Sequence, residues 1–527
     1  MPASRRDFLR GSVAALGGTA FAALGSRALH ASRAPAIVGS LQSRPSAPYG
    51  VAAGDVSGSR AVVWSRCDRP ARLVVEYATT ETFADTRRVG GPAAMPESGL
   101  TAKVVLDDLP SGQRVFYRVL FQDLGDLRSW SEPVVGQFVT PPADRRDVTL
   151  AWSADTCGQG WGINPDWGGL RLYETMRRAE PDIFVHCGDT VYADQPLQTE
   201  VALDDGSLWR NLVTEAKSKV AETIDEFRAN HLYNFTDQHL QRFAASVAQV
   251  VVWDDHEVRD NWYWERSLER DARYQEKAMA LLAARAGRAF LEHYPIGSYG
   301  GDAERSYRVL HHGPLLDVFA VDLRSYRGPN SANLQEVAGP DTTMFGARQF
   351  AWLKAALAAS RATWKVMACS MPIGLVVRDF PDHFEAFAQG EGGLPRGREI
   401  ELASLLRFIR DESIRNVVWL TGDVHYCAAH HYSPERARFT EFTPFWEFVA
   451  GPLHAGTFGP NALDATFGPE VRFVGIPEGM KPNRPPSDGL QFFGTVRIDG
   501  ATEVMTVKLH DLSGRALYSV DLPPAHD

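Results

Sequence analysis

Cysteine is scarce in this chain. The 527 residues contain five, namely Cys67, Cys157, Cys187, Cys369 and Cys427. So few cysteines exclude a small fold that depends on a dense disulfide framework, and the odd number leaves at least one thiol unpaired. Stability must therefore come from a buried apolar core, and a chain of this length can bury a large one in more than one domain.

The sequence also lacks a long apolar run and an excess of positive charge. Its formal net charge is −10, so no overall field attracts nucleic acid or an anionic membrane, and no nucleic-acid-binding surface is evident. Residues 11–25 are weakly apolar, but they are too few and too rich in Gly and Ala for a stable membrane anchor. With 44% hydrophobic and 23% charged residues, the composition is typical of a soluble globular enzyme.

An arginine pair precedes that weakly apolar stretch, in the sequence Ser4-Arg5-Arg6-Asp7-Phe8-Leu9-Arg10. The pattern predicts a twin-arginine signal peptide over residues 1–31, with a basic disordered tail as the alternative. Residues 32–47 are rich in Ser, Ala and Pro and are expected to form a linker. We therefore expect the twin-arginine export machinery as a partner and a periplasmic or secreted location.

Two patterns of secondary structure follow the linker. Residues 48–142 form short alternating apolar runs separated by turns, which predicts a β-sandwich domain of the fibronectin or immunoglobulin type. Within residues 143–527, strands alternate with helical segments, which predicts a layered α/β domain. The last three predicted strands, in residues 492–522, are expected to complete a second sheet.

Three acidic motifs each follow an apolar run. They are Gly188-Asp189-Thr190-Val191-Tyr192, Asp254-Asp255-His256-Glu257 and Gly422-Asp423-Val424-His425. Short β-branched runs that end in acidic residues indicate buried strands that deliver carboxylates to a sheet edge, which is where sites form in α/β folds. A lone aspartate at a strand end is more often a turn or capping residue. Several at one edge would repel each other, so they predict a bound cation.

The first predicted metal position combines several kinds of ligand. Asp155 and Cys157 lie two residues apart at the end of a predicted strand and therefore share a face. Together with Asp189, Tyr192 and His425 they would supply carboxylate, thiolate, phenolate and imidazole, which suits a redox-capable ion such as Fe(III). Alternatively, Cys157 is a buried core residue or pairs with Cys187.

The second predicted position is built from oxygen ligands. Asp255 and Asp423 supply carboxylates, Asn261 supplies an amide oxygen, and Asp189 is shared with the first position. Such a set favours Ca²⁺, Mg²⁺ or Mn²⁺.

Two cations a few ångströms apart suit an in-line displacement at phosphorus. His256, which is next to Asp255 in the sequence, is a candidate to protonate a leaving group. Arg259, Arg324 and the Asn261 amide are candidates for contact with a phosphate group, although salt bridges within the fold explain the two arginines equally well.

From Pro48 to the C-terminus the chain resembles the alkaline phosphatase D family of metallophosphoesterases. The resemblance is carried by long blocks: HCGDTVYAD, the segment ending in VVVWDDHEVRDNWY, VDLRSYR, GARQFAWL and WLTGDVHY. It implies a four-layer core of two stacked mixed sheets flanked by helices, and a site of ferric iron with calcium that cleaves phosphate monoesters and diesters. It also implies that iron is bound by Cys157, Asp189 and Tyr192, with Asp155 and His425 beside it, while Asp255 and Asp423 belong to the calcium side.

The chain differs from the wider metallophosphoesterase pattern at three places. GDVH stands where Gly-His-x-His is common, DDHE stands where Gly-Asn-His-Glu is usual, and the segment at residues 368–374 has no histidine. All three differences move the second position toward oxygen ligands, in agreement with the reading from the residues alone. The chain also ends in predicted strands with no lid helix, which favours an open site.

These observations predict an exported phosphoesterase that hydrolyses small-molecule phosphate esters through a metal-bound hydroxide, with Asp189 and His256 at the reacting centre. Two alternatives stay open: a phosphodiesterase specific for diesters of phospholipids or nucleotides, and an exported binding module whose metals are structural. The sequence does not indicate an oligomeric state.

Overall fold

The computed structural model describes residues 44–299 and 301–526. The predicted signal peptide and most of the predicted linker lie outside these residues. All five cysteines are buried and none forms a disulfide, so the alternative pairing of Cys157 with Cys187 is not found. Among the described residues, no helix has both the length and the apolar character needed to cross a bilayer.

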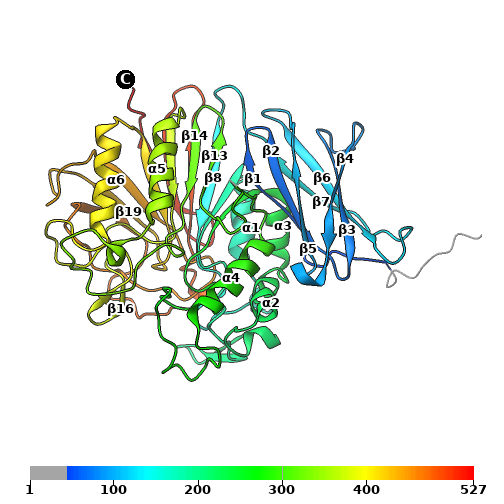
Figure 1. Cartoon of the computed structure of the whole chain (residues 1–527), viewed down its shortest axis with the longest axis horizontal. Coiled ribbons are helices and arrows are strands. Elements are labelled where there is room, and N and C mark those ends of the chain that lie inside the picture. Colours follow the sequence, from blue (N-terminus) through cyan, green and yellow to red (C-terminus); the bar gives the residue numbers. More distant parts are fainter. Residues whose placement is uncertain (1–43, 300, 527) are drawn as a thin grey trace, which may run out of the picture. The chain divides into compact units, whose positions relative to one another are not determined.

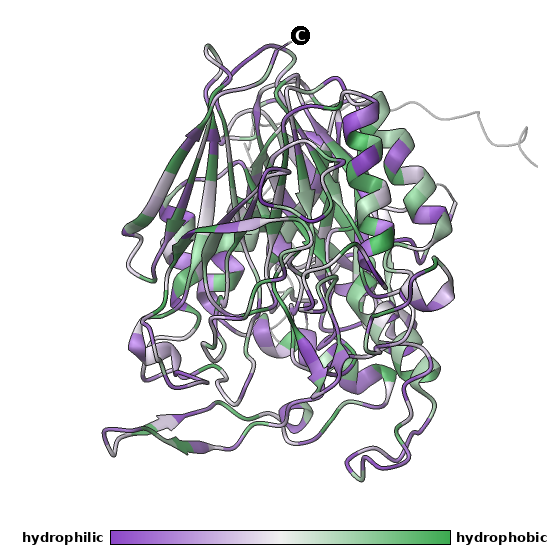
Figure 2. Ribbon diagram, turned by 90° about the vertical axis from the view of Figure 1, so that its left-hand side faces the viewer, coloured by the Kyte–Doolittle hydropathy of each residue, from purple (hydrophilic) through white to green (hydrophobic). Residues whose placement is uncertain are grey.

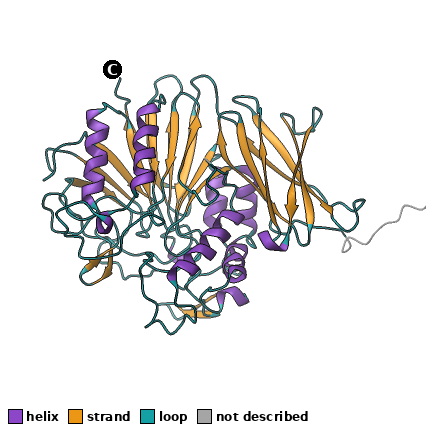
Figure 3. Cartoon of the chain, viewed as in Figure 1, coloured by secondary structure: helices purple, strands orange, loops and turns teal. Residues whose placement is uncertain are grey.

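Two mixed sheets form the centre of the molecule (Figures 1 and 3). The first has nine strands, in the order β24 (Ala516–Leu522), β23 (Met505–His510), β22 (Phe493–Ile498), β8 (Val148–Ser153), β9 (Ile183–Cys187), β12 (Ala248–Val252), β1 (Val51–Ser57), β2 (Arg60–Arg66) and β5 (Thr101–Leu106). The second has seven, in the order β13 (Arg308–His312), β14 (Leu316–Ala320), β15 (Trp364–Ala368), β18 (Val417–Thr421), β20 (Phe445–Val449), β19 (Ala428–Tyr432) and β21 (Pro469–Val474).

The sheets stack through an apolar core and are covered by helices on their outer faces. Strands β8, β9 and β12 are parallel, as are β14, β15, β18 and β20. Central strands such as β9 and β12 are buried along their whole length, which explains their mostly apolar sequences. Figure 2 shows hydrophobic residues along the strands at the centre of the molecule. The helices are α1 (Arg171–Arg178), α2 (Ile224–Asn234), α3 (Gln238–Ser246) and α4 (Met279–His293) beside the first sheet, and α5 (Ala347–Ala359) and α6 (Glu399–Asp411) beside the second. The predicted four-layer core is confirmed.

The predicted sandwich is present, but one of its sheets is part of the nine-stranded sheet. Strands β1, β2 and β5 pack against a four-stranded sheet of β4 (Arg87–Ala94), β3 (Ala71–Ala78), β6 (Arg114–Asp123) and β7 (Val134–Val139). Strand β1 also pairs in parallel with β12, with Gly54 opposite Gln249. A side chain at Gly54 would collide with the Gln249 carbonyl and with Pro295, so glycine permits this close approach. Hydrogen bonding therefore continues across the predicted boundary at residue 142, whose place as a domain limit stays a prediction.

The last three strands do not complete the second sheet as expected. Instead β22 pairs antiparallel with β8, which places β22, β23 and β24 at the edge of the first sheet. Ser153 Oγ donates to the Phe492 carbonyl at 2.7 Å, and Gly494 leaves room for the Trp152 ring. Strand periodicity does not specify which sheet edge a strand joins, whereas this complementarity does. The second sheet is completed by β19, β20 and β21.

Two short hairpins project from the loops at the strand ends. They are β10 (Glu200–Ala202) with β11 (Leu208–Arg210), and β16 (Arg378–Phe380) with β17 (His383–Phe384). The second hairpin lies in the loop that leads to α6 and brings Glu385 to the site described next.

Candidate metal centre

Predicted ligands from both sheets meet at the carboxyl ends of their parallel strands. Asp155, Asp189 and Asp255 follow β8, β9 and β12 of the first sheet, and Asp423 follows β18 of the second. Ligand atoms within 4.8 Å of one another form three overlapping groups: a first group of Asp155, Asp189 and His425; a second group of Asp254, Asp255 and Asp423; and a connecting group of Asp189, Asp255 and His256. The sharing of Asp189 and Asp255 makes these groups one continuous cluster.

The backbone at these positions is held in an uncommon conformation. Positive φ angles between 52° and 70° occur at six predicted site residues: Asp155, Cys157, Asp189, Asn261, Asp423 and His425. Outside glycine this region is sparsely populated, and it concentrates at functional sites where the surrounding structure enforces it. Backbone hydrogen bonds between the loops after β8 and β9 do so here, from Asp155 N to the Gly188 carbonyl at 3.2 Å and from Thr156 N to the Asp189 carbonyl at 2.8 Å.

The first group gathers Asp155, Tyr192 and His425. Nδ1 of His425 lies 2.6 Å from the Gly456 carbonyl, and that carbonyl can only accept. Nε2 therefore presents its lone pair, 2.8 Å from Tyr192 Oη and 3.8 Å from Asp155 Oδ1. Burial lowers the pKa of His425 to about 4, so the imidazole is neutral, as a metal ligand must be.

The carboxylate of Asp155 fits a cation in this group. Both of its oxygens are buried and neither has a hydrogen-bond partner. Burial, with repulsion from Asp254, raises its pKa well above the usual range. Burial and the carboxylates of Asp189 and Asp155 likewise raise the pKa of Tyr192, so a phenolate there requires a strong Lewis acid.

Cys157 lies in the apolar core beneath this group. Within the described part of the chain, no set of three ligands at the 4.8 Å spacing includes its sulfur. Burial raises the pKa of its thiol far above the ordinary value. The next residue, Gly158, lies against the Tyr192 ring, where a side chain would collide. The neighbouring backbone at Gly158 thus contacts the first group, and the role of Cys157 as a ligand stays a prediction.

The second group is lined by oxygen atoms, and Asn261 joins it. Asn261 N donates to Asp255 Oδ2 at 2.5 Å, and one oxygen each of Asp254 and Asp423 is buried without a partner. Burial, with repulsion from Glu385, raises the pKa of Asp423 well above its usual range. An all-oxygen group with excess negative charge suits a hard divalent cation.

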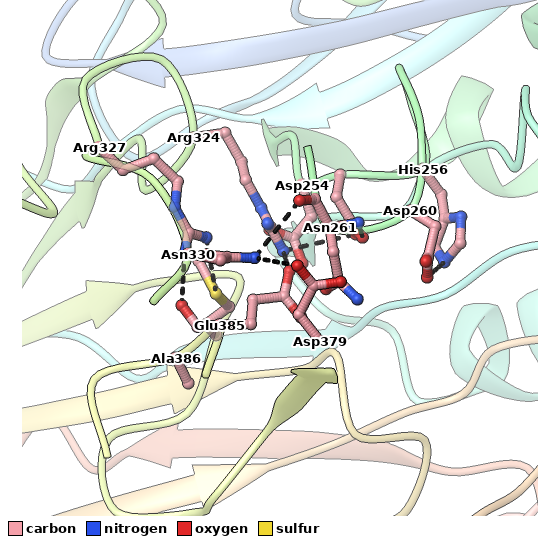
Figure 4. Close-up of polar contacts among 12 residues, drawn as sticks. Asp254, His256, Asp260, Asn261, Arg324, Arg327, Asn330, Asp379, Glu385 and Ala386 are labelled. Carbon is pink, nitrogen blue, oxygen red and sulfur yellow. Dashed lines mark hydrogen bonds and ion pairs between the residues drawn. The ribbon is translucent and has the colours of Figure 1, made fainter. Parts of the chain in front are cut away.

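Glu385 was not predicted from the sequence, although it lies in this group. Its side chain is buried, and the Asn261 amide lies against both of its carboxylate oxygens. Arg324 contacts Glu385 as well, donates from Nε to Asp254 Oδ1 at 2.5 Å, and has Nη2 at 3.5 Å from Asp255 Oδ1 (Figure 4). The only sequence signal near Glu385 is an irregular loop between a short hairpin and α6, and such loops give no periodicity to interpret.

His256 is oriented by an acid that the sequence analysis also missed. Nδ1 of His256 lies 2.8 Å from Asp194 Oδ1, and the ring stacks on Tyr192 with 4.2 Å between centroids. Burial alone would lower the pKa of His256, but Asp194, Asp255 and Asp189 together raise it well above the usual value. Nε2 lies 3.8 Å from Oδ1 of Asp260, whose side chain is about half exposed. Asp194 lies two residues after the predicted ligand Tyr192, and this closeness in the sequence could have identified it as a site residue.

The two candidate phosphate-binding arginines are engaged in contacts within the fold. Arg259 is paired with Asp271 at 3.3 Å and donates to the Asp260 carbonyl at 3.0 Å. Arg324 is fully buried by its acidic partners. For Arg324 the structure favours the salt-bridge interpretation, and a substrate contact by Arg259 stays a prediction.

Two stacked sheets between helices, with Asp, His, Asn and Tyr side chains at facing strand ends, define a metallophosphoesterase-type hydrolase. Fold similarity agrees: the purple acid phosphatase PPD1 from yellow lupin seeds matches with a TM-score of 0.54 and 12% identity, over 91% of this chain and 74% of that one.

The chain belongs to the PhoD-like phosphatase family. The family profile matches residues 150–509, and the profile of its N-terminal domain matches residues 32–142. Alkaline phosphatase D of Bacillus subtilis (strain 168) is 28% identical over 435 residues, which cover 78% of this chain and 70% of that protein. The solved structure of PhoD matches with a TM-score of 0.65 and 21% identity, over 90% of this chain and 92% of that one. The predicted family is confirmed, and the chain is a phosphoric ester hydrolase with groups that could hold metal ions.

Proposed function

We propose that this enzyme hydrolyses phosphate monoesters and diesters outside the cytoplasm. Fe(III) would be held by Asp155, Cys157, Asp189, Tyr192 and His425, and calcium by Asp255, Asp423 and Asn261. The observation that carries the proposal is the convergence of unpartnered buried carboxylate oxygens from both sheets at one point. Ionised carboxylates without partners are too costly to bury, and cations at this point offset that cost. Magnesium or manganese would satisfy the second, all-oxygen group equally well.

The metal identities follow from the donor types. Phenol and imidazole favour a transition metal at the first group, whereas oxygen donors alone favour a hard cation at the second. When bound, the cation pair supplies positive charge that lowers the pKa of a water molecule and offsets charge on the phosphoryl oxygens.

The residues of the chain supply orientation and a proton. Asp189 belongs to the first group and to the group with Asp255 and His256 that connects it to the second. Its Oδ1 also accepts the His256 backbone N–H at 3.1 Å. The water oxygen forms a bond to phosphorus while the bond from phosphorus to the alkoxide oxygen breaks. His256 Nε2 gives its proton to that alkoxide, and the proton of the attacking water passes to solvent.

Turnover of paired substrates tests this proposal. The wild-type enzyme should hydrolyse 4-nitrophenyl phosphate, bis(4-nitrophenyl) phosphate and glycerol phosphate, and Asp189→Asn should lose at least about a thousandfold in kcat. Activity on the bis-ester alone would favour the diesterase alternative. Retention of turnover by Asp189→Asn would contradict the role of Asp189 in the reaction. No turnover of any of the three substrates by the wild-type protein would favour a binding module with structural metals.

Export by the twin-arginine pathway is the second part of the proposal. It is supported by the Arg5-Arg6 motif and the weakly apolar stretch that follows it. Replacement of both arginines by lysine should retain the folded enzyme in the cytoplasm. Unchanged appearance of the variant outside the cytoplasm would refute this part without affecting the chemistry.

A further inference from the structure

Two exposed aromatic side chains lie beside the polar site. Trp264 is 40% exposed and Phe380 is 50% exposed, whereas most other aromatic side chains in the described residues are buried or half-buried. Trp264 lies in the loop that continues from His256 and Asn261, and Phe380 lies at the end of β16 in the hairpin that precedes Glu385. Both rings therefore come from the two loops that build the second group.

The contacts of Trp264 hold its ring in a defined position. Its Nε1 donates to the Ser325 carbonyl at 2.7 Å, and its ring meets the buried Trp262 ring edge to face at 5.4 Å. The one polar atom of the indole is thereby satisfied by the protein, so the part left in solvent is aromatic surface. A large ring that is both anchored and exposed marks a binding surface more often than it marks a packing defect.

Phe380 is positioned by Arg266, which also connects it to the site. The Arg266 guanidinium lies 5.4 Å from the Phe380 ring centroid and 5.9 Å from that of Tyr263. It forms an ion pair with Asp379 at 2.8 Å and donates to the Asn261 carbonyl at 2.9 Å. Asn261 in turn donates to Asp255, so two residues, Arg266 and Asn261, connect the Phe380 ring to the predicted ligand Asp255. Figure 4 shows Asp379 and Asn261 on the same side of the cluster as Glu385.

Trp264 is connected to the same group through Ser325 and Arg324. Its partner Ser325 follows Arg324 directly, and Arg324 is ion-paired with Asp254 and Glu385. Both rings are therefore connected by direct contacts to residues of the second group, through Ser325 for Trp264 and through Arg266 for Phe380. The loop that carries Trp264 also carries His256, the residue positioned to protonate the departing oxygen.

We propose that Trp264 and Phe380 form a leaving-group site for planar aromatic groups, such as the base of a nucleotide or an aryl ester. This inference rests on the proposed phosphoesterase function and adds a substrate class to it. An acyl chain requires a continuous apolar surface, but the charged pair of Arg266 and Asp379 packs against Phe380 here. A planar ring instead stacks on the exposed aromatic faces while its polar edge meets the guanidinium or carboxylate.

The test compares substrates that share a phosphate and differ in the leaving group. The ratio of kcat/KM for adenosine 5′-monophosphate to that for glycerol 3-phosphate should fall roughly tenfold in Trp264→Ala and in Phe380→Ala. Trp264→Phe keeps a ring and should retain most of the wild-type ratio. Leu127→Ala is a matched control, because Leu127 is 62% exposed in the turn between β6 and β7 of the sandwich.

Each outcome decides the inference. An unchanged ratio in both alanine variants, or an equal loss for both substrates, would overturn the leaving-group site while leaving the proposed function intact. An enzyme that hydrolyses neither substrate would count against the proposed function. In that case binding of adenosine by equilibrium dialysis replaces turnover, and the inference survives only if Trp264→Ala weakens binding and Leu127→Ala does not.

Discussion

Asp189 joins the two halves of the site. It belongs both to the group with Asp155 and His425 and to the group with Asp255 and His256. Burial, with only partial relief from the charge of His256, raises its pKa well above the usual range. A carboxylate that is costly to ionise alone would be stabilised by cations held at these groups, and Asp189 would then link them.

The pKa of His256, which lies beside Asp189, depends on Asp194. We predict that Asp194→Asn lowers the pKa of His256, because the amide no longer stabilises the imidazolium. Since the protonated form is the proton donor, the fall of kcat at alkaline pH should begin about one pH unit lower, and kcat itself should fall roughly 10- to 100-fold. A pH–rate profile measures both.

Asp205→Asn is the control for that profile, because Asp205 is exposed in the turn of the β10–β11 hairpin. A lower kcat with an unmoved alkaline limb would indicate that Asp194 is merely structural.

At the scale of elements, the strands that carry ligands were the most predictable part. An apolar run followed by Gly-Asp or Asp-Asp marks both a buried strand and its tip, and the tips of β9, β12 and β18 indeed lie together. Glu385 and the pairing of Arg324 with Asp254 were not predictable, because they depend on how long loops fold back over the sheet edge. The sheet edge that β22 joins likewise depends on the close contact of Gly494 with the Trp152 ring. The alternation of apolar residues in a strand does not predict such a contact.

The first turn of α6 contains a pH-sensitive acid. Burial, reinforced by Asp464, raises the pKa of Glu399 from 4.5 to about 8. Between these two pH values the Glu399 carboxyl group is ionised in the unfolded chain and protonated in the folded chain. The free energy of unfolding therefore falls as pH rises. Glu399→Gln cannot ionise. It should match wild type near about pH 5 and be more stable by roughly 1–3 kcal/mol near about pH 8 in urea unfolding.

Glu412→Gln serves as the reference, because Glu412 is exposed at the C-terminal end of the same helix. If Glu399→Gln gains the same stability at both pH values, the proton linkage is wrong and a packing effect is responsible.

At the scale of the whole molecule, the sandwich and the catalytic core share a sheet and a buried ion pair. Asp55 on β1 binds Arg308 on β13 of the other sheet, with Nε 2.8 Å from Oδ1 and side chains 1% and 0% exposed. Asp55→Ala leaves the guanidinium buried without its partner, and we expect a loss of roughly 3–5 kcal/mol in the free energy of unfolding. Calorimetry should show one transition that moves as a unit.

The exposed pair of Arg60 and Asp107 provides the comparison, with side chains 64% and 59% exposed. Asp107→Ala should change stability by about 1 kcal/mol at most. Two separate transitions in Asp55→Ala would show that the sandwich unfolds independently, against the shared-sheet account.

We expect ester hydrolysis to depend on a cation pair held by carboxylates from the two sheets. Metal analysis combined with turnover of glycerol 3-phosphate measures this dependence. Protein purified without chelators should carry at least two cations per chain, iron among them, and chelation should abolish hydrolysis until iron and calcium are restored. Full activity in protein shown to be free of metal would contradict the account.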